Sequence, residues 1–211
     1  MALGKVPAPW HFATLPRKRP TLFEVVELGG TRVLRVHAPA SYGNLVLPLP
    51  RMQPPLARLQ WRWRVDQAVA QADLRQRAGD DAALKLCIAF DFDKRQLPWR
   101  ERAALSLAEV STGERIPSQT LCYVWDVQLP VGAMLHNAFT HRMRYLVLQS
   151  GTAHLGQWRT EQRDLAADYA QAFGDEAPQG MPAPVSLAVS ADADNTQGEG
   201  LGYMGDIQLL P

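Results

Sequence analysis

Apolar and polar residues alternate in steps of two along several short segments of this chain. Between residues 59 and 65, for example, leucine, tryptophan and valine alternate with glutamine and arginine. This period predicts β-strands that turn one face toward a core. The segments expected as strands are 23–28, 32–36, 45–49, 59–65, 84–92, 121–126, 145–150, 185–190 and 207–209. The first two flank Gly29-Gly30, a pair that favours a hairpin turn.

Helical spacing is confined to a few stretches. Residues 164–173 carry apolar side chains at 165, 169 and 173 and are followed by Gly174, which predicts a short helix. Residues 69–77 are expected to form another. Residues 97–110 are ambiguous between helix and strand, and we expect a helical turn followed by a strand from residue 105 to 110. Many short strands with little helix predict a mainly β fold, an antiparallel β-sandwich of the jelly-roll type with one or two short helices.

The composition is that of a globular protein, with 46% hydrophobic and 20% charged residues among 211. A chain of this length is expected to form one β-sandwich domain over residues 1–211. A formal net charge of +1 and the lack of basic runs argue against a nucleic-acid surface. No apolar run is long enough for a membrane span. The first ten residues lack the apolar core of a signal peptide, so the sequence does not indicate export.

Two cysteines, Cys87 and Cys122, lie inside apolar runs. This placement favours buried reduced thiols over a disulfide framework. Pairing stays open, because the strands that carry the two residues are potential neighbours.

Charged side chains occupy the polar positions of three predicted strands. If those strands are neighbours, the side chains share one face, either an ordinary solvent-facing stripe or a binding face whose arginine forks hold a carboxylate or sugar hydroxyls. A tryptophan between a glycine-containing turn and an arginine is either a loop anchor or a stacking platform for a sugar ring. The candidate ligand-binding residues are therefore Arg62, Arg64, Lys85, Asp91, Asp126 and Trp158.

A second candidate site lies near the C-terminus. Asp192, Asp194 and Thr196 place side-chain oxygens at alternate positions, and Asp206 in the final strand is a possible fourth ligand. Alternating oxygens suit a hard cation such as calcium. The alternative is a turn in which these side chains bind backbone N–H groups. Calcium is the only cofactor that the sequence indicates.

Several segments in this order and spacing resemble one bacterial family, the domain of unknown function DUF3047. The segments that carry the resemblance are Trp61–Val65, Gly79–Ala83 with Ala89–Asp91, Tyr123–Trp125, Ser150-Gly151 with Gly156–Trp158, Arg163-Asp164 with Asp168-Tyr169, and Asp192–Thr196 with Gly205–Ile207. The resemblance spans roughly residues 20 to 210 and implies a single-domain, often exported protein without an assigned activity. The layout is also similar to galactose-binding-like jelly rolls, a resemblance that implies a sugar ligand or a structural calcium ion.

Three functions remain open from the sequence. The preferred hypothesis is a β-sandwich module that binds a carbohydrate or a cell-envelope component, with an optional structural cation. The second is an enzyme that acts on glycans with two carboxylates as acid and base. The third is a structural or protein-interaction domain without a small-molecule site. No catalytic motif is recognisable, so the sequence leans away from an enzyme.

Overall fold

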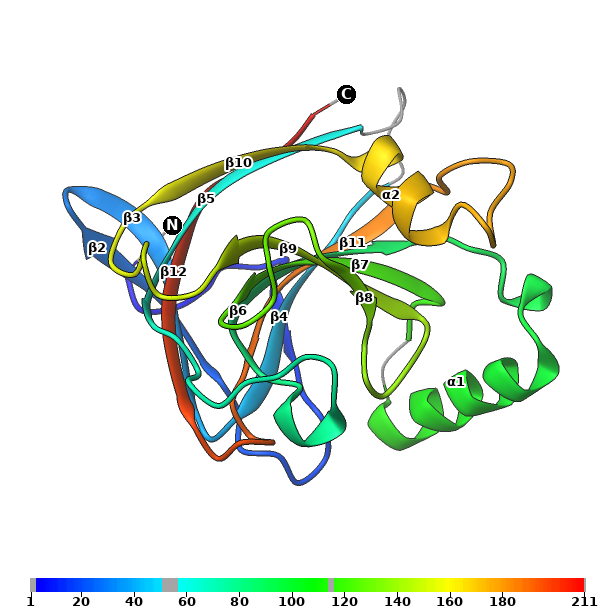
Figure 1. Ribbon diagram of the computed structural model, residues 1–211, viewed down its shortest axis with the longest axis horizontal. Coiled ribbons are helices and arrows are strands. Elements are labelled where there is room, and N and C mark those ends of the chain that lie inside the picture. The colour runs from blue at the N-terminus through cyan, green and yellow to red at the C-terminus, as the bar shows by residue number, and fades with distance from the viewer. Residues whose placement is uncertain (1–2, 51–56, 114–115, 211) are drawn as a thin grey trace.

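Two β-sheets pack face to face in the computed structural model, which describes residues 3–50, 57–113 and 116–210 (Figure 1). The sequence prediction of a mainly β sandwich is confirmed. One sheet has seven strands in the order β1 (His11–Ala13), β4 (Tyr42–Pro48), β11 (Pro184–Asp192), β6 (Ala82–Phe90), β7 (Gln119–Asp126), β9 (Met143–Ser150) and β8 (Met134–His136). The other has five in the order β10 (Arg159–Asp164), β5 (Arg58–Gln67), β12 (Glu199–Leu210), β3 (Thr31–Pro39) and β2 (Leu22–Leu28).

The strands pair antiparallel, as expected, except for β7 and β9, which run parallel. The hairpin around Gly29-Gly30 is confirmed: it joins β2 to β3, and both glycines have positive φ angles of 60° and 77°. Two consecutive residues with positive φ suit the right-handed twist of the flanking strands, and glycine adopts this conformation without steric cost.

Aromatic side chains fill the space between the sheets. Trp61 and Trp63 of β5 are fully buried and face Tyr123 and Trp125 of β7, with ring centroids 5.1 Å apart for Trp61–Tyr123 and 5.8 Å for Trp63–Trp125. The alternation predicted this inward orientation of all four rings. At the start of β12 the two sheets lie close together, because Gly200 has no side chain. A Cβ at this position would lie 2.9 Å from the Cα of Ala83 in β6.

The described ranges contain two α-helices, α1 (Trp99–Thr112) and α2 (Leu165–Phe173), which flank the sheets. Helix α2 contributes Leu165, Tyr169 and Phe173 to the core cluster. The helix predicted at 164–173 is confirmed as α2, and the side chain of Asp164 caps it by accepting a hydrogen bond from the backbone N–H of Ala167. Neither helix is long and apolar enough to cross a membrane, within the ranges that the structure describes.

Two local predictions are wrong. Residues 105–110 belong to α1, because alanine, leucine and glutamate, which favour helix, predominate from 101 to 109, and Gly113 ends the helix with a φ of 71°. Residues 69–77 form turns and lead into the short 3-10 helix η1 (Arg77–Gly79). There the carboxylate of Asp73 accepts hydrogen bonds from the backbone and side chain of Arg75, which favours a turn over a helix. A second 3-10 helix, η2 (Lys94–Gln96), precedes α1.

The two cysteines form a disulfide, so the prediction of reduced thiols is wrong. Cys87 of β6 and Cys122 of β7 occupy directly opposite positions in the antiparallel pair, with their Cα atoms 4.0 Å apart. Each cysteine sits in an apolar run because the sheet face that carries it is covered. The disulfide packs against Leu74, Val124 and Tyr145 on the side of the seven-stranded sheet that faces away from the main core.

Candidate functional site

Three of the predicted ligand-binding residues meet on the outer face of the five-stranded sheet. Arg62 and Arg64 alternate along β5 with the buried Trp61, Trp63 and Val65, so their side chains point away from the core. Trp158 lies immediately before β10, the neighbour of β5. Tyr203 of β12 pairs with Arg64 in the strand register. We call the set Arg62, Arg64, Trp158 and Tyr203 the arginine–aromatic face.

Each arginine on this face lies over an aromatic ring. The Cζ atom of Arg62 is 4.6 Å from the ring centroid of Trp158, and the Cζ atom of Arg64 is 5.9 Å from that of Tyr203. A guanidinium over a ring face is attracted by the ring quadrupole and restricts the motion of both side chains. The face therefore holds two ordered planar pairs.

Each of the two guanidinium groups also forms an ion pair with a carboxylate. Asp66 accepts hydrogen bonds from Nε and Nη2 of Arg64, at 2.5 and 3.0 Å, and this pairing raises the pKa of Arg64. An oxygen of Asp206 lies 2.6 Å from Nε of Arg62. Asp206 reaches this position because β12 is irregular between Gly205 and Gln208, where Asp206 adopts a positive φ of 55°.

Gly205 of β12 lies beside Arg62 and Val33. A Cβ at Gly205 would be 3.3 Å from Cγ1 of Val33 and 3.4 Å from Nε of Arg62. The other end of the guanidinium donates from Nη2 to the hydroxyl of Thr31 at 3.1 Å. The side chains of Arg62 and Arg64 keep about a quarter of their surface exposed, at 24% and 26%. The face thus presents ordered donors, acceptors and ring surfaces to solvent.

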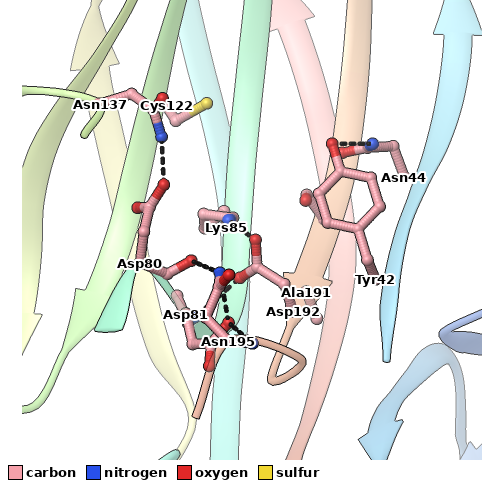
Figure 2. A network of polar contacts seen from close by, with 12 residues as sticks. Tyr42, Asn44, Asp80, Asp81, Lys85, Cys122, Asn137, Ala191, Asp192 and Asn195 are labelled. Carbon is pink, nitrogen blue, oxygen red and sulfur yellow. Dashed lines mark hydrogen bonds and ion pairs between the residues drawn. The ribbon is translucent and has the colours of Figure 1, made fainter. Parts of the chain in front are cut away.

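Lys85 lies far from this face, although the sequence grouped it with Arg62 and Arg64. It points to the outer side of the seven-stranded sheet, where loops cover it and leave it 3% exposed. Figure 2 shows its amino group directed toward Asp192 of β11, and the Nζ–Oδ2 distance is 2.6 Å. The other oxygen of Asp192 accepts from the backbone N–H of Ala82 at 2.8 Å.

Two more aspartates complete this buried group, which we call the Lys85 cluster: Lys85, Asp80, Asp81 and Asp192. Asp80 accepts a hydrogen bond from the hydroxyl of Tyr145 at 3.0 Å and another from the side chain of Asn137. Asp81 accepts from the hydroxyl and the backbone N–H of Thr196, both at 2.7 Å. Each carboxylate therefore has protein donors, which is what burial requires.

Burial and pairing act in opposite directions on the titration of this cluster. Burial raises the pKa of Asp192 to about 6, against the lowering effect of Lys85. Burial likewise raises the pKa of Asp80. For Lys85 burial lowers the pKa, but the negative charges of Asp192 and Asp80 outweigh it, so the net pKa is raised and the amine stays charged.

The four predicted metal ligands are not gathered in one place. Asp192 pairs with Lys85, Asp194 with Lys18, and Thr196 donates to Asp81. Asp206 belongs to the other sheet, beside Arg62. Across the described ranges, no group of three or more histidine, cysteine, aspartate or glutamate side chains is arranged to hold a metal ion. The alternating side chains of Asp192, Asp194 and Thr196 instead connect this turn to distant segments by hydrogen bonds and ion pairs.

The six predicted ligand residues likewise divide between the two sheets. Asp126 ends β7 and is buried, and its carboxylate accepts from the backbone N–H groups of Gln128 and Leu129 to close a turn. Asp91 is exposed just after β6. The prediction of one shared face is wrong because β5 lies in the five-stranded sheet, whereas β6 and β7 lie in the seven-stranded sheet.

Two residues of the arginine–aromatic face and its supports were not predicted from the sequence. Asp66 continues the alternation of Arg62 and Arg64 by one more step, so extending the pattern by two residues would have found it. Tyr203 lies between two glycines of β12, and only the pairing of β12 with β5 brings it beside Arg64.

Comparison with known proteins adds a family and two distant folds. A family model described as a protein of unknown function, DUF3047, matches residues 8–208, which confirms the resemblance found in the sequence. No curated protein matches the chain. A glycoside hydrolase of family 12 is 9% identical with a TM-score of 0.40, over 97% of this chain and 98% of that one. Endoglucanase 3 of Trichoderma harzianum, also of family 12, is 8% identical with a TM-score of 0.42, over 97% and 100%.

Proposed function

The chain belongs to the DUF3047 family of proteins of unknown function, and we propose that it is a binding module that holds a carbohydrate on its arginine–aromatic face. One observation carries this proposal. Two aromatic rings, Trp158 and Tyr203, are each paired with a guanidinium group on the same solvent-facing side of one sheet.

The chemistry of the face suits a sugar polymer. Aromatic rings offer flat apolar surface for the C–H side of a sugar ring, and the guanidinium forks and carboxylates supply donors and acceptors for neighbouring hydroxyls. The ion pairs with Asp66 and Asp206 order these groups before a ligand arrives, which reduces the entropy lost on binding. A sheet face is open at both ends, so it accommodates a chain of sugars better than a single small molecule.

The Lys85 cluster supports a structural role better than a catalytic one. Its three aspartates are each at most 4% exposed and accept hydrogen bonds from the protein itself. A general acid or base must reach a substrate atom directly or through one water molecule. We therefore place the binding function on the five-stranded sheet and not on this cluster.

The test is carbohydrate binding by the intact chain and by Trp158→Ala. A glycan array that includes bacterial envelope polysaccharides would identify the ligand, and titration calorimetry would measure its affinity. Loss of the stacking ring is expected to weaken binding roughly tenfold or more, equivalent to about 1.4 kcal/mol. Arg62→Lys should also weaken binding, because lysine lacks the planar fork.

The matched control is Trp99→Ala, which removes an exposed tryptophan from a different part of the molecule. It should bind the glycan as the unchanged protein does. The proposal fails if the unchanged protein binds no glycan, or if Trp158→Ala and Trp99→Ala bind equally well.

A further inference from the structure

Helix α1 carries an apolar stripe that no other described part of the chain covers. Trp99, Ala103, Leu107 and Val110 follow one another at helical spacing, and at about 100° per residue they fall within roughly 80° of arc. All four are exposed; Trp99 is 67%, Leu107 71% and Val110 83% exposed. Figure 1 shows α1 at the margin of the molecule, to one side of the two sheets.

The opposite side of α1 explains how the helix is attached. Leu105 joins the main core cluster. Glu101 pairs with Arg142 of the segment before β9, with 2.8 Å between Oε2 and Nε, and Glu109 pairs with Lys94 at 2.5 Å. Both carboxylates of the helix are therefore neutralised by cations of neighbouring segments.

Positive charge remains on the exposed side. Arg100 and Arg102 flank the stripe on its two sides, at about 100° and about −60° from Trp99 on the helical wheel. Within the described ranges neither forms an ion pair: Arg100 lies over the ring of Trp99, and Arg102 donates to the carbonyl of Arg95. The exposed surface of α1 thus combines apolar side chains with cations that no carboxylate offsets.

We propose that α1 is a docking surface for anionic lipid headgroups, and that it lies in the plane of a membrane surface with its apolar stripe facing the lipid. Helices that bind membrane interfaces carry tryptophan and leucine on one side and lysine or arginine on the polar side. Tryptophan prefers the headgroup level, where its ring is partly apolar and its N–H is hydrated. This surface is separate from the arginine–aromatic face and does not depend on carbohydrate binding.

A second copy of the chain fits the stripe less well. Specific protein interfaces bury about 800 Å² on each partner, and four side chains on three turns of helix supply only about half of that. A partner helix would also have to supply carboxylates for Arg100 and Arg102. The helix itself has none to offer, because Glu101 and Glu109 are engaged.

The experiment is cosedimentation of the full chain with vesicles of phosphatidylcholine containing phosphatidylglycerol, and with vesicles of phosphatidylcholine alone. Binding to the anionic vesicles is expected to be at least tenfold stronger and to weaken as salt is added. Leu107→Asp and Val110→Asp should reduce it at least tenfold. Both positions are exposed, so these variants are expected to fold, which circular dichroism would check.

Val131→Asp is the matched control. Val131 is 64% exposed but lies in the turn between β7 and β8, outside α1, and this variant should bind vesicles as the unchanged protein does. No binding to anionic vesicles overturns the proposal. So does equal loss in all three variants, or a dimer in solution that Leu107→Asp abolishes without any vesicle binding.

Discussion

Lys85 and Asp192 form an ion pair that solvent does not reach, with side-chain exposures of 4% and 6%. Moving two charges from water into the interior costs free energy, which their attraction and the hydrogen bond from Ala82 to Asp192 offset. If one residue of the pair is replaced, the attraction is lost but the other charge stays buried, and the folded state is destabilised. The pair therefore stabilises this junction of β6 and β11 only as a unit.

A double-mutant cycle on this pair should be strongly non-additive. Asp192→Leu leaves a buried unpaired ammonium, and Lys85→Met leaves a buried unpaired carboxylate, so each should lower the free energy of unfolding by about 3–5 kcal/mol. The combined variant should lose less than the sum, because neither charge remains. Urea unfolding at neutral pH would measure all four proteins. Simple addition of the two losses would show that the residues act independently.

For single residues, the alternation along a strand predicted correctly which side of the strand each side chain occupies. It placed Trp61 and Trp63 in the core and Arg62 and Arg64 outside, as the structure does. It did not reveal that Lys85 is buried, because alternation separates the two faces of a strand without saying which faces are covered. Loops that are distant in sequence, such as the one containing Asn137, determine that burial.

At the scale of elements, α2 was predictable because its signals are local. Apolar spacing, an aspartate at the N-cap and a glycine at the end all lie within eleven residues. Helix α1 was harder: its apolar residues occur on both the packed and the exposed sides, so the pattern between Leu105 and Val110 does not distinguish helix from strand.

Asp164→Ala tests the capping role directly. Loss of the hydrogen bond from Ala167 N–H to the Asp164 carboxylate, 3.0 Å long, should lower the free energy of unfolding by about 1 kcal/mol. Asp175→Ala is the control, because Asp175 is an exposed aspartate in the turn that follows the same helix. Chemical denaturation would compare the two. Equal stability of both variants would show that the cap contributes nothing measurable.

For the whole molecule, the number of short strands predicted a sandwich, but not which strands pair. The five-stranded sheet joins β12, the last strand, to β3 and β5, and the seven-stranded sheet contains the parallel pair β7–β9. These long-range pairings placed Tyr203 beside Arg64 and separated Lys85 from Arg62. They also placed Cys87 opposite Cys122, which apolar context alone did not predict.

Reduction of this disulfide should destabilise the whole fold and not only one strand pair. The bond closes a loop of 35 residues in the unfolded chain, which includes α1, and the loss of that constraint corresponds to about 3–4 kcal/mol. Equilibrium unfolding in urea should therefore shift to lower concentration when a reductant is present. The variant Cys87→Ala/Cys122→Ala should unfold at the same urea concentration with or without reductant. An unchanged midpoint for the natural sequence, or two reactive thiols in the unfolded protein before reduction, would contradict the bond.

Both sulfur atoms are buried in the middle of the seven-stranded sheet, so a reductant reaches them only after β6 has opened from β7. The rate of thiol release would therefore also measure how often that sheet opens.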